Sequence, residues 1–267
     1  DGGGSTRIPA ACNGVVGIKQ SVGVIPHSQA QDLYGNQTYV TPMTRTVGDT
    51  ALMLQAMAGP SPVDPWSIGL RSHDYVAAAL RTLKDLGASI EYFDGAGFEV
   101  EPIWRAINHT VWRARFGPLV ERHPDSFSET FRRQVESAAG VSGVEYQEAM
   151  FARSQLFKRV QALFERADLL AMPTLTRSAV ALEQDLFAPL DIDGQPYENV
   201  RAHWYPWTMP FNMTGHPAIS LPSGFGGDGM PLGLQLVGRF QDDAALLGAS
   251  AAFEAATGFA ARRPELA

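Results

Sequence analysis

Cysteine, lysine and long apolar runs are scarce in this sequence of 267 residues. The single cysteine, Cys12, excludes an internal disulfide and a cysteine-rich zinc site, and it suits a reducing compartment. No apolar run approaches the roughly 18–20 residues that a membrane-spanning helix needs. The opening residues DGGG lack the basic and apolar stretches of a signal peptide. We therefore expect a cytoplasmic protein with no membrane span.

Charged residues are few, and arginine far outnumbers lysine among them. There are 18 arginines, three lysines and 28 acidic residues, which give a formal net charge of −7 and a pI of about 5.4. An acidic surface repels phosphate backbones, so we do not expect a direct nucleic-acid partner. Hydrophobic residues make up 45% of the chain and charged residues 18%, which is the balance of a folded globular protein.

Short apolar runs bounded by glycine or proline alternate with longer amphipathic segments. The helical period predicts helices over 47–57, 73–86, 100–120, 144–167 and 243–256. The short apolar runs predict strands over 14–18, 90–93, 169–172, 218–221 and 233–237, with loop over 27–42. Alternating helices and strands predict an α/β protein, in which an α/β/α layered domain has a central mixed and mostly buried sheet. No domain boundary is evident, so residues 1–267 are predicted to form one domain.

The segment most informative about chemistry is 1–10, DGGGSTRIPA. Consecutive glycines allow backbone N–H groups to converge on one point, and Ser5 at the end of such a turn lies beside donors for a developing oxyanion. Those are two parts of an acyl-transfer site. A phosphate-binding loop is the rival, but it needs Gly-Lys-Ser/Thr opening a helix, and Pro9 followed by a strand argues against that. A plain flexible turn remains open.

This segment resembles the nucleophile segment of the amidase-signature family. Other matches follow in the family's order: CNGVVGIK at 12–19, DPWS at 64–67, ADLLAMPT at 167–174, PFNMTGHPAISLP at 210–222 and GMPLGLQLVG at 229–238. The resemblance covers nearly the whole chain. It identifies the chain as the C-terminal part of an amidase-signature serine hydrolase, opening a few residues before the nucleophile, and thus as a partial catalytic domain.

The resemblance implies roles for the residues of the first segment. Ser5 matches the nucleophile that forms the acyl-enzyme, while Asp1 and Arg7 match positions that brace the loop by hydrogen bonding. The resemblance also implies an oxyanion hole formed by the backbone N–H groups of Gly2, Gly3, Gly4 and Ser5.

The chain departs from the family in the residues that act as the catalytic base. The family's triad adds a lysine and a serine after a cis peptide bond, both upstream of the nucleophile, and no matching Gly-Gly-Ser-Ser-Gly-Gly stretch occurs here. Lys19 matches a structural lysine, while Lys84 and Lys158 fall in amphipathic helices as surface residues. We therefore expect residues 1–267 alone to have no amidase turnover, and a non-catalytic remnant stays open for this chain.

Aromatic residues are concentrated in two stretches, 100–120 and 204–211. If these aromatic side chains line an acyl pocket, that pocket would suit apolar or aromatic substrates. The alternative for each side chain is that it packs in the hydrophobic core. The predicted pocket residues are Trp104, Phe151, Trp204, Trp207 and Phe211.

These observations predict an amidase that hydrolyses a carboxamide C–N bond of a small molecule through a serine acyl-enzyme. No metal or organic cofactor is implied. The alternative is the A subunit of a glutamine-dependent amidotransferase, which shares these motifs and passes ammonia to a partner protein. The aromatic, lysine-poor region 100–211 favours a free-standing amidase, and a homodimer is left open.

Overall fold

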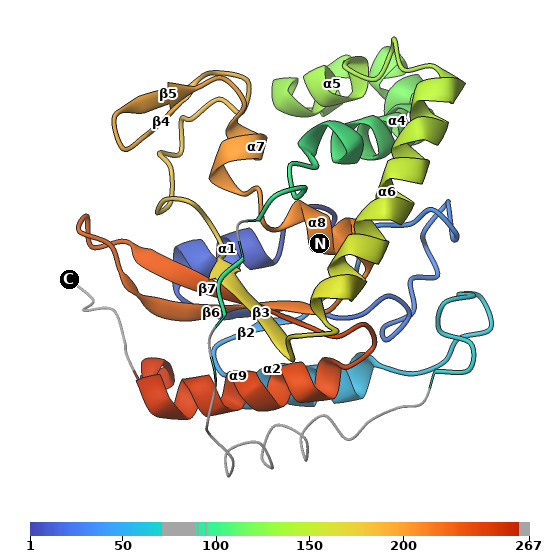
Figure 1. Cartoon of the computed structure of the whole chain (residues 1–267). Coiled ribbons are helices and arrows are strands. Elements are labelled where there is room, and N and C mark those ends of the chain that lie inside the picture. Colours follow the sequence, from blue (N-terminus) through green and yellow to red (C-terminus); the bar gives the residue numbers. More distant parts are fainter. Residues whose placement is uncertain (71–88, 90, 94, 262–267) are drawn as a thin grey trace.

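The computed structural model describes residues 1–70, 89, 91–93 and 95–261 (Figure 1). The main helices are α1 (Arg7–Asn13), α2 (Val47–Met57), α4 (Glu101–Arg122), α5 (Glu129–Glu136), α6 (Gly143–Leu163), α7 (Val200–Trp204), α8 (Met209–Thr214) and α9 (Asp243–Thr257). The strands are β1 (Val16–Lys19), β2 (Met43–Thr44), β3 (Leu169–Pro173), β4 (Leu190–Ile192), β5 (Gln195–Tyr197), β6 (Ala218–Phe225) and β7 (Pro231–Gly238).

Five of these strands form a central sheet in the order β2-β1-β6-β7-β3, and β4 pairs with β5 in a separate hairpin. The α/β class is confirmed, but every pairing between the described strands is antiparallel, so the expected mixed pairing is not found among them. For β6 and β7 the reason lies in the connection between them. The N–H of Gly226 donates to the carbonyl of Met230 at 2.8 Å, closing a short turn, and a short turn can join only antiparallel neighbours.

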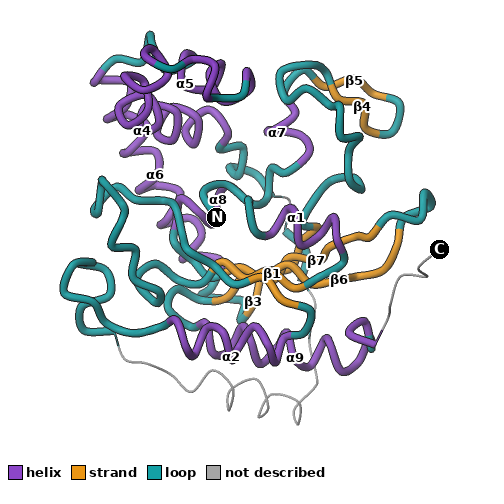
Figure 2. The backbone as a smooth tube through the Cα atoms, turned by 180° about the vertical axis from the view of Figure 1, so that it is seen from behind, coloured by secondary structure: helices purple, strands orange, loops and turns teal. Residues whose placement is uncertain are grey.

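Helices cover both faces of the sheet, which gives the three predicted layers (Figures 1 and 2). Helices α2 and α9 pack on one face, and α1 lies on the other, on the side of α4, α6 and α8. Alternate side chains of a strand point to opposite faces. Ile219 and Leu221 accordingly join the core under α2 and α9, whereas Ala218 joins the core shared with α4 and α6.

The predicted helices at 47–57, 100–120, 144–167 and 243–256 are confirmed, with small shifts at their ends. The predicted strands at 14–18, 169–172, 218–221 and 233–237 are also found. The strand predicted at 90–93 is wrong for the described residues 91–93, which have no regular structure. The helix predicted at 73–86 lies outside the described residues.

Helix α1 differs from the sequence prediction, in which Pro9 argued against a helix. Pro9 is the third residue of α1. The first backbone N–H groups of a helix have no acceptor within it, so proline is tolerated there without loss of a hydrogen bond. Gly14, in the left-handed region at φ 62°, ends the helix. Ser5 therefore lies between the glycine turn and a helix. This removes one argument against a phosphate-binding loop. The Gly-Lys-Ser/Thr pattern of such a loop also needs a lysine before the serine, and this chain has Gly4 there.

Candidate active site

Ser5 is exposed at the end of the glycine turn, two residues before α1 begins. Two of the three preceding glycines are required by their surroundings. A methyl group on Gly3 would lie 2.7 Å from the ring of Trp104, and one on Gly4 would lie 2.6 Å from Ile8 Cδ1. Gly4 also has φ 133°, a conformation that other residues rarely adopt. The loop can therefore take this shape only with glycine at both positions.

The carbonyl groups of the three glycines are all tied back to the protein. Trp104 Nε1 donates to the carbonyl of Gly2 at 2.8 Å, and Thr208 Oγ1 donates to that of Gly3 at 2.6 Å. The N–H of Ile8 donates to the carbonyl of Gly4 at 2.7 Å. These bonds, made from α4, the start of α8 and α1, fix the plane of each peptide group in the turn.

The N–H groups of the loop divide into two sets. Gly4 N–H donates to Asp1 Oδ1 at 2.9 Å, so this predicted oxyanion donor is already engaged. By contrast, the N–H groups of Gly2, Gly3 and Ser5 make no hydrogen bond to any residue that the structure describes. Three of the four predicted donors are therefore left free beside the serine.

Asp1 and Arg7 form a fully buried ion pair, with Arg7 Nη2 3.1 Å from Asp1 Oδ1. The carboxylate also accepts the N–H groups of Thr6 and Arg7, which holds the start of α1 against the turn. Burial lowers the pKa of Arg7 to about 9, which still leaves the guanidinium charged at neutral pH. The pair thus braces the loop from within the protein and lies away from solvent.

Arg7 is held in turn by residues to which the sequence analysis assigned no role. Its Nη1 donates to Gln235 Oε1 at 2.7 Å, and its Nη2 donates to Asn212 Oδ1 and to the carbonyl of Thr208. Gln235 and Asn212 each stand between two apolar residues in buried elements. A buried polar side chain needs a partner, so this isolation within an apolar run was the signal that could have found them.

The described lysines do not contact Ser5. Lys19 is fully buried, donates to the carbonyl of Gln20 at 2.9 Å and lies over the ring of Tyr39. Burial holds the pKa of Lys19 well below its usual range. Lys158 is exposed on α6, and Lys84 lies outside the described residues.

The five aromatic residues predicted to line a pocket do not form one group. Trp104, Trp204 and Phe211 are buried in the core shared by α4, α6 and the sheet, and Trp207 is partly buried against it. Phe151 is 63% exposed on α6, which argues against a place for it in an apolar pocket. Of the five, Trp104 contacts the glycine turn directly.

Two further findings concern the described part of the chain. No helix there is both long enough and apolar enough to span a membrane. Nor do its His, Cys, Asp and Glu side chains gather in a group of three or more that could hold a metal ion.

Comparisons with known proteins agree on one family. A family model described as Amidase matches residues 1–113 and 119–247. The chain is 32% identical to the acylamidase of Rhodococcus erythropolis, over 99% of this chain and 62% of that protein. It is also 32% identical to the A subunit of the glutamyl-tRNA(Gln) amidotransferase of Moorella thermoacetica, over 100% of this chain and 64% of that protein.

A solved structure shares the fold. A bacterial aryl acylamidase of the amidase-signature family superposes with a TM-score of 0.82 at 26% identity, over 99% of this chain and 64% of that chain. The chain thus spans less than two thirds of the length of these relatives.

Proposed function

The chain belongs to the amidase family, and from that membership we propose that the whole protein containing it hydrolyses carboxamide C–N bonds with Ser5 as the nucleophile. The observation that carries the proposal is the exposed Ser5 beside three backbone N–H groups without a partner in the described part of the chain. Preorganised donors of this kind stabilise the negative charge that develops on a carbonyl oxygen during acyl transfer.

The proposed reaction has two halves. Ser5 Oγ bonds to the amide carbon as a base takes its proton, and the carbonyl oxygen becomes an oxyanion held by the N–H groups of Gly2, Gly3 and Ser5. The C–N bond then breaks, the amine leaves with that proton, and an ester of Ser5 remains. Water attacks this ester, releasing the carboxylic acid and restoring the hydroxyl. In the amidase-signature pattern a lysine and a second serine carry the proton.

The acyl group is proposed to be apolar or aromatic. The support is Trp104, which among the predicted pocket residues is the one that touches the turn before Ser5. Fully burying one apolar side chain contributes about 1.5–3 kcal/mol. We therefore expect kcat/KM for an aryl or long-chain amide to exceed that for acetamide by roughly 10- to 100-fold. Equal values for the two substrates would contradict this preference.

An amidotransferase A subunit is the second candidate, because the relative from Moorella thermoacetica carries that name and is 32% identical to this chain, as is the acylamidase. Ammonia release from glutamine, compared with hydrolysis of an aryl amide, separates the two. We favour the free-standing amidase because of the aromatic region around Trp104. A cytoplasmic location and a homodimer stay predictions.

Covalent labelling tests the nucleophile. In the whole protein that contains this chain, a fluorophosphonate is expected to label Ser5, and Ser5→Ala should remove both the label and the amide turnover. Ser126→Ala is the matched control, because Ser126 is also exposed and lies in the short helix Pro124–Ser126, apart from the glycine turn. Labelling that persists in Ser5→Ala would overturn the assignment.

A further inference from the structure

Asn212, in helix α8, is fully buried and bonded to residues far from it in the sequence. Its Nδ2 donates to the carbonyl oxygen of Asp1 at 2.8 Å and to Asp1 Oδ1 at 2.9 Å. The same nitrogen donates to the carbonyl oxygen of Gln37 at 3.3 Å, while Asn212 Oδ1 accepts from Arg7 Nη2. These partners fix which way the amide is turned, because arginine only donates and carbonyl oxygens only accept.

The carbonyl of Asp1 and the free N–H of Gly2 belong to one peptide group. The peptide bonds of the described residues are trans. A trans peptide group is planar, so its C=O and its N–H point in opposite directions. The N–H of Tyr39 also donates to the Asp1 carbonyl, at 3.0 Å. The two donors on this carbonyl therefore set the direction in which the Gly2 N–H points.

The other two free N–H groups beside the nucleophile are held in the same way. Trp104 Nε1 donates to the carbonyl of the peptide group that carries the Gly3 N–H, at 2.8 Å. The N–H of Ile8 donates to the carbonyl of the group that carries the Ser5 N–H, at 2.7 Å. A hydrogen bond to a carbonyl also polarises the peptide group and makes its N–H a stronger donor. Each proposed oxyanion donor thus has its own partner at the opposite end of its peptide group.

Asn212 also reaches the peptide group that does not face an oxyanion. Asp1 Oδ1, which Asn212 Nδ2 contacts, accepts the N–H of Gly4 at 2.9 Å. Thr208 Oγ1 donates to the carbonyl at the other end of that group, at 2.6 Å. One buried amide therefore holds the free Gly2 donor directly and the engaged Gly4 donor through Asp1.

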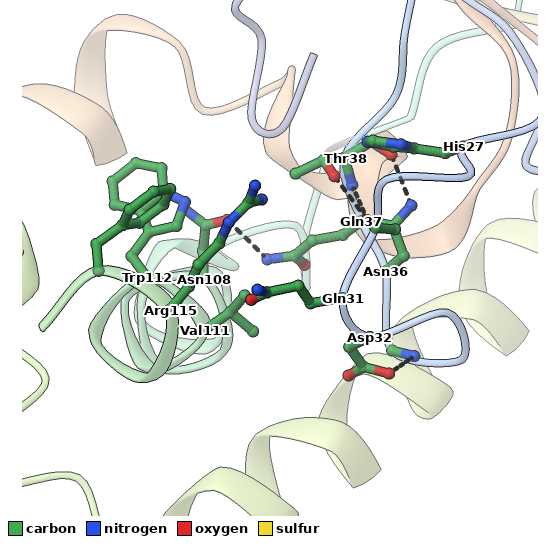
Figure 3. Close-up of a pocket in the computed structure, with 13 residues that line it drawn as sticks. His27, Gln31, Asp32, Asn36, Gln37, Thr38, Asn108, Val111, Trp112 and Arg115 are labelled. Atoms are coloured by element: carbon green, nitrogen blue, oxygen red, sulfur yellow. Dashed lines mark hydrogen bonds between the residues drawn. The ribbon is translucent and has the colours of Figure 1, made fainter. Parts of the chain in front are cut away.

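The support of Asn212 is itself internally bonded. Asn36 and Thr38 are joined by hydrogen bonds from Asn36 Nδ2 to the Thr38 carbonyl at 2.8 Å and from the Thr38 N–H to Asn36 Oδ1 at 2.9 Å (Figure 3). The carbonyl of Gln37, between them, is the third acceptor of Asn212 Nδ2. The hydroxyl of Tyr39 donates to the backbone carbonyl of Asn212 at 3.0 Å. The position of the amide therefore does not depend on the glycine turn alone.

Resting on the proposed function, we propose that Asn212 is a positioning residue of the oxyanion hole, which directs and polarises the N–H of Gly2 without contacting the substrate. The negative charge on the carbonyl oxygen develops only as the tetrahedral intermediate forms. A donor that is turned away from it therefore slows the chemical step and leaves substrate binding unchanged. A residue that only stabilised the fold would give no such selective loss.

Asn212→Leu tests the proposal in the whole protein that contains this chain. Leucine has a similar shape and removes both N–H donors. Deleting an oxyanion donor outright costs about 100- to 1,000-fold in kcat, so misdirecting one of three is expected to cost about 10- to 100-fold. KM should stay within about twofold of its original value, because the ground state lacks the oxyanion. Rates are expressed per folded protein, measured by circular dichroism, because Arg7 also loses an acceptor.

A trifluoromethyl ketone with the acyl group of the substrate gives the readout that a structural role would not move. Ser5 Oγ adds to the ketone carbon, the hydroxyl proton passes to the base, and the carbonyl oxygen becomes an oxyanion. Its inhibition constant should rise in Asn212→Leu by the factor by which kcat falls. The alcohol formed by reducing this ketone makes no adduct, and its inhibition constant should not change.

Asn108→Leu is the matched control. Asn108 is 3% exposed, and in the described part of the chain its side chain accepts from Gln37 Nε2 at 3.4 Å and is not bonded to the glycine turn (Figure 3). It should keep kcat and both inhibition constants. If Asn212→Leu fails to fold, Asn212→Ser carries the test, because a serine hydroxyl is too short to span the same acceptors. It should lower kcat and weaken the ketone in the same direction.

The outcomes separate this proposal from the proposed function. An unchanged kcat in a folded Asn212 variant, or equal weakening of the ketone and the alcohol, overturns the positioning role and leaves the amidase intact. An unaltered whole protein that neither hydrolyses amides nor binds the ketone more tightly than the alcohol overturns the proposed function, and this inference with it.

Discussion

Trp104 is a side chain through which α4 holds the glycine turn before Ser5. Its indole N–H bonds the carbonyl of Gly2 while its ring packs against Gly3. Trp104→Phe would keep most of the ring and lose the hydrogen bond, freeing the peptide group whose neighbouring N–H is proposed to bind the oxyanion. We expect stability to fall by about 1 kcal/mol and kcat/KM by up to about 100-fold, as a misplaced site loses rate. Urea unfolding and steady-state kinetics measure the two effects.

Trp66→Phe is the control for that change. The Trp66 indole N–H also donates to a backbone carbonyl, that of Leu33 at 2.6 Å, but it does not contact the glycine turn. It should lose a similar or smaller amount of stability and keep its kcat/KM. Equal kinetic losses in both variants would show that Trp104 has no special link to the loop.

Arg7 is expected to matter more for stability than any surface charge. Its partner Asp1 is also fully buried, and removing one member of such a pair typically costs about 3–5 kcal/mol, because the other charge is left without compensation. Arg7→Met should lower the free energy of unfolding by that amount in urea titrations. Arg7→Lys keeps the charge but loses the planar fork, so it should recover only part of the loss. A loss below about 1 kcal/mol for Arg7→Met would contradict this account.

At the scale of elements, the glycine turn is predicted to tolerate no Cβ at Gly4. Gly4→Ala would place a methyl group 2.6 Å from both Ile8 Cδ1 and Thr208 Oγ1, so the turn must shift. A shift of about 1 Å can cost about 100-fold in rate. Gly59→Ala is the control, because Gly59 has a similar φ of 148° but open space around its Cα. Both variants share the backbone strain, and only Gly4→Ala should lose kcat/KM.

The elements that the sequence predicted well have strong local patterns. Helix α2 follows its apolar period from Val47 to Met57, and α9 ends at a glycine, Gly258, in the left-handed conformation. Helix α1 was missed because proline was judged by its usual effect inside a helix, and that effect is absent in the first turn. The run predicted as a strand at 90–93 is apolar, but its described residues 91–93 have no strand partner, and pairing is a property of the fold.

The candidate site was predictable only as far as the motif extends. The position of Ser5 after a run of glycines follows from a short local segment. The steric need for Gly3 and Gly4 depends also on distant residues, Trp104 and Thr208. The partners of Arg7 could not be predicted, because Asn212 and Gln235 are separated from it by 205 and 228 residues. Contacts at that separation depend on how the sheet and α8 fold together.

At the scale of the whole molecule, the first residues of the chain are bonded to α8 and β7. Asn212 Nδ2 donates both to the carbonyl and to the carboxylate of Asp1, at 2.8 and 2.9 Å, while Arg7 binds Gln235 on β7. The geometry around Ser5 therefore depends on α8 and β7 as well as on the turn. The conformation of the glycine turn alone does not determine the position of Ser5.

The same buried architecture should make the protein sensitive to acid through His216. This side chain is fully buried, stacks on Phe164 and lies near Phe157 and Phe240, and burial lowers its pKa to about 3. In the unfolded chain a histidine titrates near 6.5. Between pH 6.5 and 3 the unfolded state therefore binds a proton that the folded state does not, so stability falls as the pH is lowered through this range. The slope is about 1.4 kcal/mol per pH unit for one such group.

A histidine on helix α4 adds to this effect. His109, buried on α4, has its pKa lowered to about 4 by burial and contributes in the same direction. His216→Phe removes one titrating group from the same aromatic surroundings. Urea unfolding at pH 7, 6, 5 and 4 should show a stability loss toward acid that is shallower in His216→Phe than in the unaltered protein. His123→Phe is the control, because His123 is exposed after the end of α4, and its slope should match that of the unaltered protein. Identical slopes for His216→Phe and the unaltered protein would show that His216 can take up a proton while the protein stays folded.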